Sequence, residues 1–285
     1  RRRSPSITRR ERISRSMRRG RYRIFLLLLL PAALLAFSLL CPYLRRREEK
    51  FRIACGEDLA SRLFMELIEE QRDVDAVADP TVFGDCCGSY AMMSLVTGEL
   101  DAALLCEDAA EKLRSLREDY VELGVISRDT DVLALAEAGR EIRRIGYMNQ
   151  RDTQRRSLEA AYPSAELFPM SPSALPTALF GGEIDAAVLD LGTALSLSLP
   201  LRKLGDGTVS AVLVAREDCL KKEAFQKLLS DYEKKLPELS NEKEITGLLS
   251  HYMREDEITE EKREQWKAMG PSFESLREGR EGSGG

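Results

Sequence analysis

The chain contains nearly the same phrase twice, as LVTGELDAALL at 95–105 and as LFGGEIDAAVL at 179–189. In each copy a glycine ends an apolar run, a Glu-aliphatic-Asp stretch follows, and two alanines open a second apolar run. A glycine in this place is typical of a helix C-terminus, because glycine adopts the left-handed conformation without strain. Each phrase therefore predicts a helix, a tight turn and a buried strand, with the acidic residues serving the turn.

Similar elements surround both copies. The runs FRIAC at 51–55 and VDAVADPTVF at 74–83 have the composition of strands, and apolar residues at helical spacing lie between them. Extended runs follow at 120–136, and TVSAVLVARED at 208–218 is again strand-like. Strands that alternate with helices of this length indicate βαβ units. We therefore expect an α/β protein of two lobes, each a mostly parallel sheet flanked by helices.

The first 44 residues have a different character. Residues 1–23 contain eleven Arg and one Glu, and the uncharged segment 24–44 is long enough to cross a bilayer as a helix. Basic sequence ahead of such a span favours a cytoplasmic N-terminus with the remainder outside. We expect 24–44 to be an uncleaved signal anchor or a signal peptide, and SLLC at 38–41 resembles a lipobox in which Cys41 would be lipidated. The run from Met17 resembles a signal-sequence n-region, so 1–16 is expected to be an upstream extension.

Charge excludes one class of partner. The formal net charge is −5, although the basic residues are concentrated in 1–23. The remainder of the chain is therefore much more acidic than the total indicates. Phosphate backbones repel such a surface, so the sequence argues against a nucleic-acid partner.

These motifs resemble those of type II periplasmic substrate-binding proteins of ABC importers, in particular the branch for nitrate, sulfonates and thiamine precursors. The resemblance rests on the two GE[LI]DAA phrases, on VELGVISRDTDVLAL at 121–135 and on the returning strand at 208–218. It implies two lobes joined by two crossover strands that close on a solute by a hinge motion. Lobe 1 would comprise 45–130 plus 208–270, lobe 2 would comprise 131–207, and 271–285 would be a disordered tail.

The resemblance also implies the partners. The protein would bind a small-molecule solute and present it to the permease and ATPase subunits of an importer, at the outer face of a bacterial cytoplasmic membrane. We expect no cofactor, no catalytic residue and a monomeric soluble part.

Ligands of open α/β sheets bind beyond the C-terminal ends of the strands, where helix N-termini point at them. This rule selects three loops in each expected lobe. The candidate ligand-binding residues in these loops are Cys55, Gly56, Cys86, Cys87, Gly88, Ser89, Cys106, Tyr147, Met148, Asn149, Arg151, Ser171 and Asp190. Gly88 and Ser89 opposite Arg151 would suit a carboxylate, and Tyr147 would stack on a flat ligand, so we expect an anionic or heteroaromatic organic solute. The alternative is that Ser89 caps a helix and Arg151 is a solvated charge.

The cysteines on the expected cleft side of lobe 1 leave three interpretations open. Cys55, Cys86, Cys87 and Cys106 are thiols of the kind that soft metals prefer. Outside the cytoplasm two of them would be able to form a disulfide. Cysteine is also a common small buried residue with no further role.

The rival functional class is an enzyme on the same fold. The pyrimidine synthase of thiamine biosynthesis resembles this branch and has a Cys-rich run, of which DCC at 85–87 is a short counterpart. Menaquinone-pathway enzymes share the fold as well. The export segment favours a binding protein, and so does the position of the single histidine, His251, far from the six loops. A tethered sensor without its own permease is a third possibility.

Overall fold

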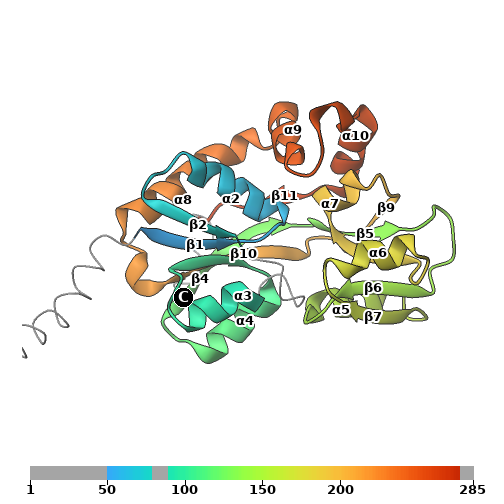
Figure 1. Cartoon of the computed structure of the whole chain (residues 1–285), viewed down its shortest axis with the longest axis horizontal. Coiled ribbons are helices and arrows are strands. Elements are labelled where there is room, and N and C mark those ends of the chain that lie inside the picture. The colour runs from blue at the N-terminus through green and yellow to red at the C-terminus, as the bar shows by residue number, and fades with distance from the viewer. Residues whose placement is uncertain (1–49, 79–88, 277–285) are drawn as a thin grey trace, which may run out of the picture. The chain divides into compact units, whose positions relative to one another are not determined.

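Two mixed sheets organise the chain, one in each lobe (Figure 1). The computed structural model describes residues 50–78 and 89–276. Predictions that fall on 1–49, 79–88 and 277–285 lie outside the described residues, including the membrane segment, the DCC run and the end of the tail. From Phe51 onward the chain forms one unit, and the description below concerns that unit.

Lobe 1 is built on a sheet with the strand order β11-β4-β10-β3-β1-β2. Parallel pairing joins β2, β1 and β3, whereas β10 is antiparallel to both β3 and β4. The strands are β1 (Phe51–Cys55), β2 (Val74–Ala78), β3 (Ala102–Leu105), β4 (Tyr120–Arg128), β10 (Val209–Arg216) and β11 (Ser272–Phe273).

The side-chain alternation of these strands buries both faces of the sheet. In β1, Phe51, Ile53 and Cys55 point to one apolar cluster and Ala54 points to the other, as the period of two requires. Helices α2 (Leu59–Glu69) and α8 (Glu223–Lys235) cover the first face, and α3 (Ser89–Val96) and α4 (Glu107–Leu116) cover the second.

Lobe 2 has the strand order β7-β6-β8-β5-β9. The sheet is parallel across β7, β6 and β8 and antiparallel across β8, β5 and β9. Its elements are β5 (Asp131–Leu135), β6 (Arg144–Met148), α5 (Asp152–Ala161), β7 (Glu166–Met170), α6 (Ala174–Phe180), β8 (Ala186–Asp190), α7 (Leu191–Ser196) and β9 (Leu201–Lys203). The chain passes from the first sheet to the second between β4 and β5, and it returns between β9 and β10.

The repeated phrase occupies equivalent places in the two lobes. Gly98 and Gly182 follow α3 and α6 with φ of 76° and 72°, so both helices end in the left-handed glycine that the sequence predicts. Each phrase then leads into a strand with a parallel partner, which is β1 for β3 in lobe 1 and β6 for β8 in lobe 2. Ala102 lies opposite Ile53, and Ala186 lies opposite Ile145.

The aspartate of the phrase joins the turn to the neighbouring strand. Asp101 donates its N–H to the carbonyl of Arg52 (2.9 Å), and its carboxylate accepts the N–H of Arg52 (3.0 Å). Asp185 makes the same exchange with Arg144, at 2.8 and 2.9 Å. Glu99 and Glu183 are exposed. The aspartates therefore serve the turn, and they do so by satisfying a strand-end amide that the sheet leaves unpaired.

The two crossover segments are bonded to each other at Asp129, a non-glycine residue with φ of 57°. Its carboxylate accepts the N–H groups of Gly207 (2.9 Å) and Thr208 (2.8 Å), and its own N–H donates to the carbonyl of Thr208. These three hydrogen bonds therefore hold together the segments that enter and leave lobe 2.

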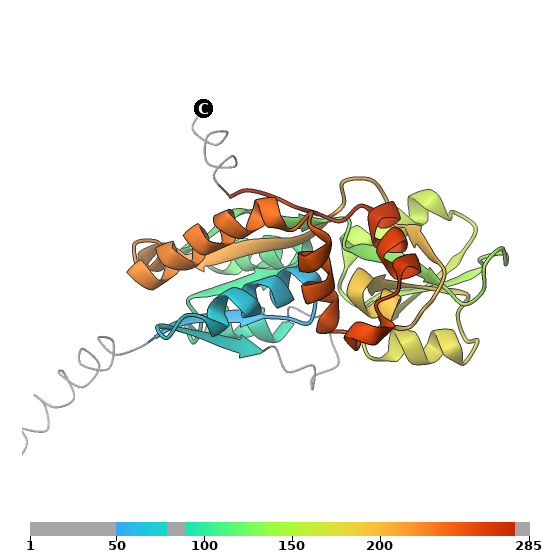
Figure 2. The same ribbon diagram turned by 90° about the horizontal axis from the view of Figure 1, so that it is seen from above.

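The C-terminal segment contacts both lobes (Figures 1 and 2). Helix α9 (Glu242–Ser250) packs on α2 of lobe 1, and α10 (Glu260–Met269) packs on α7 and β9 of lobe 2. Short 3-10 turns at Glu217–Cys219, Leu236–Glu238 and Glu255–Glu257 connect the elements around these helices.

The start of the predicted tail belongs to the fold. Ser272 and Phe273 pair with β4 as strand β11, and the N–H of Leu276 donates to Glu233 at 2.8 Å. The prediction of disorder from residue 271 is therefore wrong for 271–276. Composition does not reveal this short edge strand, because the strand depends on partners 144 and 146 residues away in the sequence.

Candidate functional site

The ends of β1 and β3 in lobe 1 meet the ends of β6 and β8 in lobe 2. Helices α2, α4, α5 and α7 begin at these strand ends, so their N-termini converge where the two lobes face each other. These strand ends are the place at which the strand order predicts a ligand cleft. Hydrogen bonds join the lobes directly across it.

The first link across the cleft is Asp190, which ends β8. One carboxylate oxygen caps α7 by accepting the N–H groups of Gly192 (3.0 Å) and Thr193 (3.4 Å). The other accepts the N–H of Leu59, the first residue of α2 in lobe 1, at 3.2 Å. Burial, reinforced by the nearby charge of Asp58, raises the pKa of Asp190 to about 8.

The second link runs in the opposite direction. Asp108 lies in the first turn of α4 in lobe 1, and its carboxylate accepts the N–H (3.1 Å) and the hydroxyl (3.0 Å) of Thr153 at the start of α5. The guanidinium of Arg151 lies 3.7 Å from the same carboxylate. Burial raises the pKa of Asp108.

Arg151 itself is only 4% exposed. Its Nη2 lies 2.7 Å from the carboxylate of Asp131 in β5, which also accepts the side-chain amide of Gln154 at 3.0 Å. The sequence suggested that Arg151 would receive an anion. In the structure its charge faces two carboxylates of the chain itself.

A tight loop leads from β1 into α2. The carboxylate of Asp58 caps α2 by accepting the N–H (3.0 Å) and hydroxyl (2.9 Å) of Ser61, and the Ser61 oxygen accepts the N–H of Gly56 at 2.7 Å. A Cβ at Gly56 would lie 2.9 Å from the Asp58 carboxylate, which explains the glycine. Burial raises the pKa of Asp58, and the charge of Asp131 adds to the effect.

The described cysteines next to the cleft are buried. Cys55 is 1% exposed and Cys106 is 4% exposed. Burial raises the pKa of Cys55 to about 12, with the charge of Asp58 as a second cause, so its thiol stays protonated. Within the part of the chain that the structure describes, Cys55 and Cys219 form no disulfide. Within 50–78 and 89–276, no group of three or more His, Cys, Asp or Glu residues is arranged to hold a metal ion.

Several predicted residues of lobe 2 form its framework. Tyr147 lies in the apolar cluster of Leu158 and Val188, which places its ring in the core. The N–H of Met148 donates to Gln154 (3.1 Å), and that of Asn149 donates to the carbonyl of Met170 (2.8 Å).

Of the remaining predicted residues, the structure describes Ser171 and Ser89. The hydroxyl of Ser171 lies 3.4 Å from that of Ser173. Ser89 begins α3, whereas Cys86, Cys87 and Gly88 lie outside the described residues. Their predicted roles stay predictions.

Sequence analysis selects Asp190 among these acidic residues, but it does not single out Asp58, Asp108, Asp131 or Tyr252. The loops that hold Asp58 and Asp108 were selected, but no role was assigned to these carboxylates. Tyr252 follows α9, its hydroxyl donates to the carbonyl of Glu57 (2.7 Å), and its ring lies where a side chain at Gly192 would stand. The only sequence feature that relates to this contact is the glycine at 192, and its role becomes clear only when the Tyr252 ring is seen against it.

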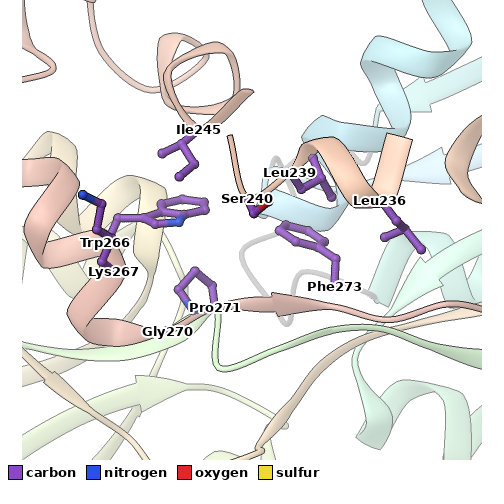
Figure 3. A pocket seen from close by; sticks show the side chains of 9 residues that line it. All are labelled: Leu236, Leu239, Ser240, Ile245, Trp266, Lys267, Gly270, Pro271 and Phe273. Atoms are coloured by element: carbon purple, nitrogen blue, oxygen red, sulfur yellow. The ribbon is translucent and has the colours of Figure 1, made fainter. Parts of the chain in front are cut away.

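A pocket of about 400 Å³ lies away from the strand ends (Figure 3). It is formed by the turn after α8, by α9, by α10 and by β11. Trp266, Ile245 and Phe273 contribute apolar side chains to it, and Trp266 is 5% exposed. This pocket belongs to the C-terminal segment and not to the cleft.

Solved structures share this fold. The chain is similar to the ligand-binding component of an ABC-type import system from Staphylococcus aureus with zinc bound, with a TM-score of 0.58 and 18% identity over 80% of this chain and 86% of that one. It is similar to the alkanesulfonate-binding protein SsuA from Xanthomonas axonopodis pv. citri bound to MOPS, with a TM-score of 0.58 and 14% identity over 79% and 86% of the two chains. A nutrient-binding protein from Burkholderia cenocepacia bound to methionine matches with a TM-score of 0.51 and 12% identity over 78% and 99%.

These likenesses confirm the predicted fold, the two-lobed α/β architecture of ABC-type substrate-binding proteins. Zinc, a sulfonate and an amino acid are bound on this one architecture, so the fold does not name a ligand. No protein-family model matches the chain, and no curated protein matches its sequence. Among the residues that the structure describes, no helix has the length and apolarity to span a membrane.

Proposed function

We propose that the protein is a solute-binding protein that delivers a small molecule to an ABC importer by hinge closure of its two lobes. The observation that carries the proposal is the convergence of four helix N-termini between two lobes that are connected through paired crossover segments and a C-terminal bridge. Residues 24–44 would tether it to the outer face of a bacterial cytoplasmic membrane, and its partners would be permease and ATPase subunits.

The charges of the cleft bear on the class of solute. An organic anion would meet the carboxylates of Asp131 and Asp108, and Arg151 is a cation that already faces both of them. The described residues therefore favour a solute without net negative charge, and they are compatible with the heteroaromatic part of the expectation. An anion site at the start of α3 would involve residues outside the described part.

The same residues argue for binding without chemistry. A nucleophile needs an activating base within hydrogen-bond reach. The pKa of Cys55 is raised to about 12, which is opposite to activation. His251 is bonded to Glu66 on the surface formed by α2 and α9, away from the strand ends. The proposal therefore assigns no catalytic residue.

The test is to purify the full chain in mild detergent and to record its mass under native and then denaturing conditions. We expect an organic adduct of defined mass that is lost on denaturation. A panel of amines, heteroaromatic compounds and organic acids is then screened for an increase in melting temperature. The matched variant Asp131→Asn should change the response to the bound class, whereas Glu159→Gln on the exposed face of α5 should not.

Two results would contradict the proposal. One is a protein with no adduct and no stabilisation by any compound of the panel. The other is turnover of an added compound, which would favour an enzyme on the same fold. A preference for organic acids would leave the receptor standing and refute the charge argument.

A further inference from the structure

The two lobes supply each other's helix caps. Asp190 of lobe 2 accepts the first N–H of α2 in lobe 1, and Asp108 of lobe 1 accepts an N–H at the start of α5 in lobe 2. The bonds are 3.2 Å and 3.1 Å long. The N–H groups in the first turn of a helix have no acceptor within the helix, and here carboxyl oxygens of the opposite lobe accept them.

We infer that Asp108 and Asp190 form a reciprocal latch that stabilises the closed arrangement of the two lobes. Each carboxylate takes a position at a helix N-terminus that a ligand would otherwise occupy in this fold. A solute gains access only after these bonds open, so the latch lowers the apparent affinity by the fraction of molecules that are closed.

A third contact supports the closed arrangement. Tyr252 of the C-terminal segment donates to the carbonyl of Glu57 in lobe 1, while its ring packs against Gly192 at the start of α7 in lobe 2. A Cβ at Gly192 would lie 2.5 Å from that ring, so the approach requires glycine. The guanidinium of Arg62 lies 5.8 Å above the ring centre. The segment therefore joins the lobes at the same side as Asp190.

The energetics of the two carboxylates suit a latch that opens. Asp190 and Asp108 are withdrawn from water, and burial raises the pKa of both. Their hydrogen bonds offset a desolvation cost that is recovered when the lobes separate. Such a contact favours one arrangement of the lobes but contributes only a small net free energy. A solute is therefore able to compete with it for the helix N-termini.

The inference rests on the proposed function, since closure matters only if the cleft takes a solute. It is tested without any solute, so its failure leaves that function standing. Hydrogen exchange is followed by mass spectrometry on the full chain in detergent, in peptides that cover 57–63 and 150–156. In the wild type we expect protection at both Leu59 and Thr153.

The decisive variant is Asp108→Ala. Faster exchange at Thr153 would follow from the loss of its acceptor alone. Exchange at Leu59, on the other side of the cleft, will increase at least tenfold only if the lobes separate. The matched control is Glu107→Ala, which removes an exposed carboxylate from the same first turn of α4 and should leave Leu59 unchanged.

Peptides from β3 and β8 report whether the lobes stay folded. If Asp108→Ala exposes them, the comparison moves to Thr153→Val, which removes one bond to Asp108 and keeps the backbone. Unchanged exchange at Leu59 in the folded variant overturns the latch. Rapid exchange at Leu59 and Thr153 in the wild type also overturns it, because the cleft is then open without solute.

Discussion

The carboxylate of Asp185 provides the sharpest test of the repeated phrase. One of its oxygens accepts the N–H groups of Arg143 (3.1 Å) and Arg144 (2.9 Å) at the start of β6, and the other lies 3.3 Å from the guanidinium of Arg144. Asp185 is 6% exposed. Each charge-assisted bond to a backbone amide contributes about 1.5 kcal/mol or more, and the partly exposed ion pair adds little. We therefore expect Asp185→Ala to lower the free energy of unfolding of lobe 2 by about 3 kcal/mol.

The assay is urea denaturation of the full chain in detergent. Trp266 is the only tryptophan of the sequence, and its helix α10 packs on α7 and β9, so its fluorescence reports on the contact between the C-terminal segment and lobe 2. The matched control is Glu183→Ala, because Glu183 is the exposed acid of the same turn. If Asp185→Ala and Glu183→Ala unfold within about 0.5 kcal/mol of each other, the reasoning about the phrase is refuted.

The effect of Asp185 also depends on pH with a definite sign. Burial acts to raise its pKa, but the bonds from Arg143 and Arg144 outweigh burial and hold the pKa below its usual value. The stabilisation is therefore complete above the unfolded-state pKa of about 4 and is lost as the pH falls through the lower folded-state value. The gap between wild type and Asp185→Ala should shrink below about pH 4. A gap independent of pH would contradict this assignment.

Three further outcomes are expected. Gly182→Ala should lower the free energy of unfolding by about 1 kcal/mol because of the positive φ alone, since a Cβ there meets no atom within 4 Å. Gly146→Ala should lower it by about 2 kcal/mol, because its Cβ would lie 2.7 Å from two side chains. Urea titration that gives the reverse order would contradict the packing. Cys55 should resist iodoacetamide at pH 8 in the native protein and react after denaturation, as mass spectrometry would show; rapid native labelling would refute its burial. Asp129→Ala should speed hydrogen exchange at 207–208 at least tenfold while the sheets stay protected, and unchanged exchange would show that the crossovers are held by other contacts.

Much of the architecture was predictable because it depends on local chemistry. The glycines at 98 and 182 end helices through their own φ preference, and the alanines that follow begin buried strands in both lobes. The element order then allows few topologies, since βαβ connections are right-handed and short. The candidate site was predictable only as a set of loops. Sequence patterns predict that Arg151 and Tyr147 lie in those loops. They do not predict the carboxylates that surround Arg151 or the apolar core that surrounds Tyr147.

The sequence by itself determined the α/β class, the two lobes and the strand ends at which a cleft forms, because hydrophobic period and glycine conformation act within a few residues of the chain. Only the tertiary structure decided which residues of the two lobes face each other across that cleft. Asp108 and Thr153 are 45 residues apart, and Leu59 and Asp190 are 131 apart. Their bonds exist because the paired crossovers and the C-terminal segment hold the two lobes at one separation. The local conformational preferences of these residues do not determine that separation.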